Sequence, residues 1–251
     1  MSGIEVSGLS HRYGETQALS DVHFTVPPGE ICGLLGPNGA GKTTALSAIV
    51  GTLRPDAGTI RLGGYCPQEG LQARQLLGYV PDSGGLYGLL SPREHLLLAS
   101  DLHELDPAVA AAKMVELVEQ FGIGAILDQR IDTLSKGQRQ RTAICCALLH
   151  EPRILLLDEP LNGLDVDAAR VLRDVIRSAA DNGAAVLYCS HILDVVERLC
   201  DRAIILSAGK VVADAPTSEL VAKSADKTLE SVFHALTHSA DVDELSGAFD
   251  A

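Results

Sequence analysis

Residues 31–44 read ICGLLGPNGAGKTT: a short apolar run, a glycine-rich loop, and the start of a segment with helical spacing. The span from Gly36 to Thr43 matches the pattern G-x-x-x-x-G-K-[ST]. Glycines let the backbone curl so that successive N–H groups point at phosphate oxygens, and the following helix adds its positive end. Because an apolar strand precedes the loop and a helix follows it, the stretch predicts a phosphate-binding loop in an α/β fold.

In this loop, Lys42 would reach the β- and γ-phosphates of a nucleotide, and the Thr43 hydroxyl would bind Mg²⁺. The alternative is a glycine-rich turn that carries a lysine by chance. The candidate nucleotide-binding residues of this stretch are Gly36, Asn38, Gly39, Gly41, Lys42, Thr43 and Thr44.

The stretch ILLLDEP, residues 154–160, is a second apolar run and ends in Asp158 and Glu159. Ligands of open α/β sheets bind at the carboxyl edge of the strands, where both acids would lie. Asp158 can then hold Mg²⁺, and Glu159 can polarise an attacking water. Alone, this acidic pair is more typical of an ordinary solvated turn; beside a phosphate-binding loop it predicts a site for phosphoryl chemistry.

The remaining pattern predicts strands in the first sixty residues, helices from about 88 to 150, and strands alternating with helices beyond 150. Two helices have explicit start signals: Ser91 with Glu94, and Ser135 with Gln138, both fit a capping box. Continuously apolar strands that alternate with helices indicate a mostly parallel sheet covered on both faces.

The formal net charge of −13 argues against a nucleic-acid partner, because phosphate backbones require a basic surface. The six cysteines form no C-x-x-C pair, so we expect reduced thiols and no zinc site. No secretory signal is visible, and no apolar run reaches the roughly 18 residues that a membrane span requires. Action at a membrane would therefore need a partner that supplies the spanning helices.

Between the two phosphate elements lies LSKGQRQR, residues 134–141. With this segment, the chain resembles the ATP-binding subunits of ABC transporters, whose signature is close to L-S-G-G-Q. The resemblance extends from Ile4 to about Ala213. It implies an α/β fold: a P-loop NTPase core with a mostly parallel sheet, an N-terminal antiparallel β subdomain and an inserted α-helical subdomain.

The resemblance implies a head-to-tail dimer with ATP and Mg²⁺ at the interface, each ATP held by one subunit's phosphate loop and the other's signature. Ser135, Gly137 and Gln138 would face the γ-phosphate bound by the partner. Lys136 stands where the family commonly has glycine, which puts a cation beside the anion. For Arg139 and Arg141, further along the helix, we expect solvated or salt-bridged roles.

Three further residues of this chain each match a single functional position of the family. Tyr13 matches the aromatic residue that stacks on adenine, although an ordinary exposed strand tyrosine is the alternative. Asp165, in LNGLD, matches a residue that touches the partner's phosphate loop. His191 matches the switch histidine that reads the γ-phosphate, and it joins Glu159 and Lys42 as the expected catalytic residues.

One position departs from the family. Where a glutamine usually follows the GYV strand, this chain has Asp82. Gln68 lies before that strand, so we do not expect it to substitute. Asp82 is shorter by one methylene and normally ionised, yet it can still hold Mg²⁺ or orient water. The expected metal ligands are therefore Thr43, Asp82 and Asp158.

Further features, including PDSGGLY and the C-terminal KTLESVFHALT, resemble the branch that exports sodium, drugs, polymers or lipids. We therefore expect an ATPase that powers export through a separate transmembrane permease, as a homodimer at the cytoplasmic face of the cell membrane. The expected organisation is one domain over 1–237, with a core at 1–87 and 151–215, a helical subdomain at 88–150, a C-terminal helix at 217–237 and an acidic flexible tail at 238–251.

Two alternatives remain. A soluble ABC-type ATPase acting on ribosomes or nucleic acid usually fuses two cassettes or inserts a long coiled coil, and this chain does neither. A regulatory module that binds nucleotide without catalysis would not need the full set of Lys42, Asp158, Glu159 and His191.

Overall fold

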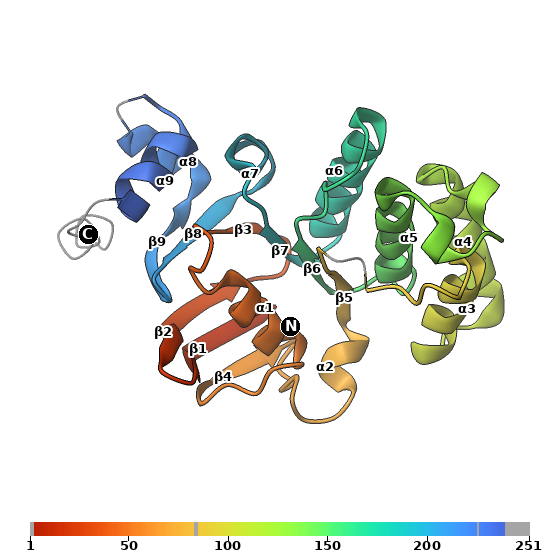
Figure 1. Cartoon of the computed structure of the whole chain (residues 1–251), viewed down its shortest axis with the longest axis horizontal. Coiled ribbons are helices and arrows are strands. Elements are labelled where there is room, and N and C mark those ends of the chain that lie inside the picture. The colour runs from red at the N-terminus through yellow and green to blue at the C-terminus, as the bar shows by residue number, and fades with distance from the viewer. Residues whose placement is uncertain (1–2, 83–84, 225, 239–251) are drawn as a thin grey trace.

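A computed structural model describes residues 3–82, 85–224 and 226–238 and contains two β-sheets with helices around them (Figure 1). The larger sheet has the strand order β5-β6-β7-β3-β8-β9. Its strands are β5 (Leu77–Val80), β6 (Ile154–Asp158), β7 (Ala185–Cys189), β3 (Ile31–Leu35), β8 (Arg202–Ser207) and β9 (Lys210–Pro216). Neighbours from β5 to β8 pair in parallel, whereas β9 pairs antiparallel with β8.

The smaller sheet is antiparallel and has the order β2-β1-β4. It consists of β1 (Ile4–Tyr13), β2 (Thr16–Val26) and β4 (Ala57–Leu62). In Figure 1 it lies beside α1, away from the helices of the chain's middle third. The predicted α/β fold, with a mostly parallel sheet and an N-terminal antiparallel sheet, is confirmed.

Helices gather at both ends of the molecule, and others lie between them along the sheets. In Figure 1, α3, α4 and α5 gather at one end of the molecule, beyond β5 and β6, and α8 and α9 lie at the other end. The bounds are α1 (Lys42–Val50), α2 (Gln72–Gln75), α3 (Pro92–Leu102), α4 (Pro107–Gln120), α5 (Lys136–Leu148), α6 (Val166–Asp181), α7 (Leu193–Leu199), α8 (Thr217–Lys223) and α9 (Leu229–His238). Short 3₁₀ turns cover Gly124–Ile126 and Ile131–Thr133.

Both expected capping boxes are confirmed. At the start of α3, Ser91 Oγ accepts from the Glu94 backbone N–H at 3.2 Å, and Glu94 Oε2 accepts from the Ser91 N–H at 2.7 Å. At the start of α5, Ser135 and Gln138 exchange the same two bonds, at 3.2 and 2.9 Å. Each box satisfies donors that a helix N-terminus would otherwise leave unpaired.

The two faces of the larger sheet bury separate hydrophobic clusters. In β6, Leu155 and Leu157 belong to one cluster, while Ile154 and Leu156 belong to the other. Successive side chains of a strand point to opposite faces, so an unbroken apolar run requires cover on both sides. This burial fixes the strands whose carboxyl ends carry the predicted site.

The expectation of one C-terminal helix over 217–237 is wrong, because two helices occupy this region. Ser224 ends α8 in an extended conformation with φ −86° and ψ 141°. The α9 helix then packs on α7 and α8 and buries Leu229, Val232 and Leu236. A single continuous helix would carry that apolar face away from the core. The expected acidic tail lies outside the described residues, apart from His238 at the end of α9.

All six cysteines lie in the described part of the chain and are free thiols. Burial raises the pKa of the Cys32 and Cys145 thiols well above the ordinary range, which disfavours the reactive thiolate. Across residues 3–82, 85–224 and 226–238, no helix combines the length and apolar character needed to traverse a bilayer.

Candidate functional site

The site follows from the register of the larger sheet. Leu34 of β3 and Asp158 of β6 both pair with Cys189 of β7, and Val80 of β5 pairs with Leu157. The segments that follow these four strands therefore begin at one edge of the sheet. They are the phosphate-binding loop, the acidic pair, the Ser190–His191 segment and the segment that carries Asp82.

The phosphate-binding loop leaves β3 and enters α1 through Gly41, whose φ is 106°. A β-carbon at Gly41 would lie 2.5 Å from the Ala18 carbonyl oxygen, so glycine is required both by conformation and by space. A β-carbon at Gly39 would meet nothing within 4 Å. The loop is thus packed against the protein at its entry to α1 and open at its tip.

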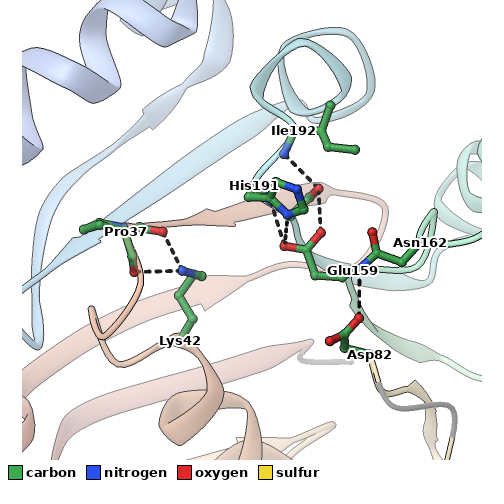
Figure 2. A network of polar contacts seen from close by, with 9 residues as sticks. Pro37, Lys42, Asp82, Glu159, Asn162, His191 and Ile192 are labelled. Carbon is green, nitrogen blue, oxygen red and sulfur yellow. Dashed lines mark hydrogen bonds and ion pairs between the residues drawn. The ribbon is translucent and has the colours of Figure 1, made fainter.

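Lys42 is the first residue of α1, and its ammonium group lies over the loop. Lys42 Nζ donates to the Gly36 and Pro37 carbonyl oxygens at 2.5 and 3.0 Å (Figure 2). Carbonyl oxygens attract a cation less strongly than a phosphate does, so these contacts can be exchanged for an anion. Thr43 and Thr44 follow in the first turn of the same helix.

Asp158 ends β6 and is half-buried. Burial is the largest influence on its carboxyl group and raises its pKa; nearby Asp82 and Glu159 act in the same direction, and Lys42 opposes them. A partly buried carboxylate near other acids is stabilised by a cation. The position therefore suits a metal ligand.

Glu159 adopts a left-handed backbone conformation with φ 49°, unusual for a residue with a side chain. Its carboxylate is held by the segment that follows β7. Glu159 Oε1 lies 2.7 Å from His191 Nδ1 and accepts from the His191 backbone N–H at 2.9 Å. Glu159 Oε2 accepts from Ser190 Oγ at 3.2 Å (Figure 2).

These two side chains differ in exposure: 15% of the Glu159 side chain is accessible, against 68% of that of His191. Two residues predicted separately from the sequence are thus brought into direct contact, with the acid sheltered and the histidine facing outward. Ser190 also accepts from the Ile192 N–H at 3.1 Å, so its hydroxyl links the acid to the turn before α7.

Asp82 is exposed near the same sheet edge, and its Oδ1 accepts from Asn162 Nδ2 at 2.8 Å (Figure 2). Asn162 belongs to residues 159–165, which we call the Glu159 loop. Gln68 instead donates to the Ala48 and Leu53 carbonyl oxygens at 2.8 and 3.3 Å. Its amide is therefore occupied in tying the chain after α1, as expected for a residue that does not replace the missing glutamine.

The predicted signature segment forms the N-terminal turn of α5. Ser135 and Lys136 are exposed there, while Gly137 faces the Glu159 loop. A β-carbon at Gly137 would lie 2.3 Å from the Gly163 carbonyl oxygen, so only glycine fits. The positive end of α5 is thus exposed on one side and closely packed on the other.

Asp165 is the N-cap of α6, where its Oδ1 accepts from the Ala168 N–H at 2.9 Å. Its Oδ2 forms an ion pair with Arg141 of α5. Tyr13 ends β1 with 54% of its surface exposed, and its ring meets His11 edge-on at a centroid distance of 4.6 Å. Its exposure leaves a face free for stacking.

The donor set suits a nucleotide with a divalent cation. A loop open at its tip, a lysine on exchangeable carbonyl contacts and a half-buried carboxylate all lie along one edge of the sheet. In the described part of the chain, no three His, Cys, Asp or Glu side chains form a self-sufficient metal site. A cation would therefore need oxygen ligands from the nucleotide as well, as Mg²⁺ commonly has.

Sequence reasoning missed residues that support the site. Ser190 and Asn162 hold the predicted acids, and Gln140 joins α5 to the Glu159 loop. Ser190 adjoins a predicted residue, which is a local signal. Asn162 and Gln140 act on partners distant in the sequence, so no local pattern identifies them. For Arg141 a solvated or salt-bridged role is predicted, and the structure shows its ion pair with Asp165.

Comparisons with known proteins identify the family that this chain resembles. The model of the ABC transporter family matches residues 19–162, more than half of the chain. YdbJ of Bacillus subtilis (strain 168), an uncharacterized ABC transporter ATP-binding protein, is 37% identical over 213 residues, covering 84% of this chain and 68% of YdbJ. The Nod factor export ATP-binding protein I of Paraburkholderia xenovorans (strain LB400) is 36% identical over 222 residues, covering 88% and 73%.

A solved structure of the ATP-binding subunit of an ABC transporter has a TM-score of 0.89 and 33% identity to this chain. The match covers 94% of this chain and 99% of that one. The resemblance to exporter ATPases read from the sequence is confirmed by the Nod factor relative. The chain therefore belongs to the ABC transporter family, among its ATP-binding subunits.

Proposed function

We propose that this chain hydrolyses ATP in a head-to-tail dimer and powers export through a separate membrane permease. The observation that carries the proposal is the carboxylate of Glu159, held by Ser190 and His191 at the sheet edge where the phosphate-binding loop begins. A sheltered carboxylate beside a phosphate site is suited to activate water.

The residues divide the work by position. Lys42 and the free backbone N–H groups of the phosphate-binding loop bind the phosphates, and Tyr13 stacks on the adenine. Glu159 accepts a proton from the attacking water, while His191 contacts the γ-phosphate and keeps the carboxylate oriented. Thr43, Asp158 and Asp82 would hold Mg²⁺, which neutralises charge on the phosphates.

A second copy of the chain is needed because the two halves of the expected ATP site lie apart in one chain. In Figure 1, α5 stands away from α1. Ser135 and Lys136, at the start of α5, are exposed. A head-to-tail partner would bring its own α5 to the loop, so that Ser135, Gly137 and Gln138 face the γ-phosphate. Asp165 would then approach the partner's phosphate-binding loop.

Export through a permease at the cytoplasmic face of the membrane is supported by the exporter relative. The acidic charge of the chain disfavours the alternative of a nucleic-acid partner. The function is tested by purifying the chain with its membrane partner and measuring phosphate release. We expect Mg²⁺-dependent hydrolysis that rises when a transported solute is added. Nucleotide binding without turnover, with or without the partner, would instead indicate the regulatory module.

The same assay can test the proposed role of Asp82 in the metal site. We expect Asp82→Ala to lower the rate of Mg²⁺-dependent hydrolysis by about ten- to 100-fold, as loss of a metal-site partner commonly does. Asp82→Gln restores the residue usual in the family and should keep most of the activity. Asp181→Ala, at an exposed acid at the end of α6, is the matched control. An unchanged rate and Mg²⁺ dependence in Asp82→Ala would remove Asp82 from the metal site.

A further inference from the structure

The Glu159 loop, residues 159–165, packs against the first turns of α5 at three points. The first is a buried hydrogen bond: Gln140 Nε2 donates to the Pro160 carbonyl oxygen at 3.0 Å. Only 2% of Gln140 is exposed, so water cannot replace its hydrogen bond to the Pro160 carbonyl. The bond lies directly beside Glu159 in the chain.

The second point is the close approach of Gly137 and Gly163, where the Gly163 carbonyl leaves no room for a side chain at Gly137 and the backbone conformation of Gly163 disfavours one there. Gly163 has φ +82°, and a β-carbon there would lie 3.4 Å from the Gly137 nitrogen and 3.1 Å from Lys136 Cγ. Because the two backbones touch, a shift of α5 cannot be absorbed by side-chain motion between them.

The third point is Arg141, which joins three helices. Its guanidinium pairs with Asp165, the N-cap of α6, and its Nη1 donates at 3.4 Å to the Phe121 carbonyl oxygen at the end of α4. Arg141 itself lies on α5, and 23% of its side chain is exposed. A planar guanidinium that is bonded on two sides fixes the relative orientation of the groups it joins and also supplies a positive charge.

The Glu159 loop is also bonded to residues of the expected hydrolysis site. The Glu159 carboxylate is bound to Ser190 and His191, and Asn162 in the middle of the loop donates to Asp82. One short segment is therefore held at its start in the chain's own hydrolysis site and along its length on the chain's own α5.

We propose that Gln140 and Arg141 are positioning residues through which contact of α5 with one ATP sets the position of Glu159, which acts on the other ATP. This inference rests on the proposed head-to-tail dimer, in which the α5 and the Glu159 of one chain belong to different ATP sites. Rigid contacts between them couple the two sites.

The test separates binding from turnover. We expect Gln140→Met and Arg141→Ala to keep ATP affinity and ATP-driven dimerisation, while kcat falls by about ten- to 100-fold because Glu159 is misplaced. Arg141→Lys, which keeps the pairing with Asp165, should recover part of the loss. Arg139→Ala, an exposed cation on the same helix, is the control and should leave kcat unchanged.

A cycle with Glu159→Gln excludes a merely structural role. If the two residues act through Glu159, adding either variant to Glu159→Gln should lower the residual hydrolysis no further and should retain the ATP-bound dimer. An additive loss, or an unchanged kcat in both single variants, would overturn the inference while leaving the proposed function intact. A wild-type chain that neither dimerises with ATP nor hydrolyses it would overturn the proposed function, and this inference with it.

Discussion

Glu159→Gln should abolish turnover while leaving ATP binding intact. We expect the hydrolysis rate to fall by about 10²- to 10⁴-fold, the contribution typical of a positioned general base. The amide oxygen can still accept from the His191 N–H, and the Ser190 hydroxyl can accept from the new amide group, so the local structure should persist. What is lost is the ability to take a proton from water.

Because the variant cannot complete the reaction, ATP should hold two chains together. Light scattering after size-exclusion chromatography should show a dimer with ATP and Mg²⁺ and a monomer without them. Glu119→Gln, an exposed acid on α4, is the matched control and should behave as the wild type. A monomeric Glu159→Gln chain that nonetheless binds ATP would contradict the head-to-tail dimer.

Lys42→Ala should weaken ATP binding itself. The ammonium group is expected to exchange the Gly36 and Pro37 carbonyl oxygens for phosphate oxygens. A hydrogen bond to a charged group contributes about 1.5–3 kcal/mol, which corresponds to about ten- to 100-fold in the dissociation constant. Equilibrium binding of a fluorescent ATP analogue measures this directly.

The expected order of effects distinguishes Lys42 from Glu159. Lys42→Ala should raise the dissociation constant and lose the ATP-dependent dimer, whereas Glu159→Gln should keep both. Lys210→Ala, at an exposed lysine that begins β9, controls for the loss of one positive charge. Equal ATP affinity in Lys42→Ala and wild type would show that the loop does not bind phosphate through this lysine.

The local parts of the fold could be predicted because each is encoded within a few residues. Ser91 and Ser135 begin helices since their hydroxyls and the acid or amide three residues later satisfy the first N–H groups. The apolar runs at 31–35 and 154–158 are buried strands since both faces must be covered. Asp158 and Glu159 were identified because they end such a strand.

The C-terminal region could not be predicted in the same way. The residues between Thr217 and Thr237 include an apolar stripe that suits one helix, yet the chain turns at Ser224 to return α9 to the core. Leu229 is fixed there by its N–H, which donates to Glu197 Oε2 at 2.8 Å, a contact 32 residues distant. Packing against α7 and α8 decides the turn, and no propensity in the segment reveals it.

The sequence by itself determined which strands end in candidate site residues, where the phosphate-binding loop lies and how α5 is capped at its start. These features depend on neighbours along the chain. Only the tertiary structure decided that Glu159 meets His191 and that Gln140 and Arg141 hold the loop after Glu159. Those contacts require elements far apart in the sequence to arrive at one place. Their relative positions are set by the burial of whole faces of sheet and helix, which no short pattern specifies.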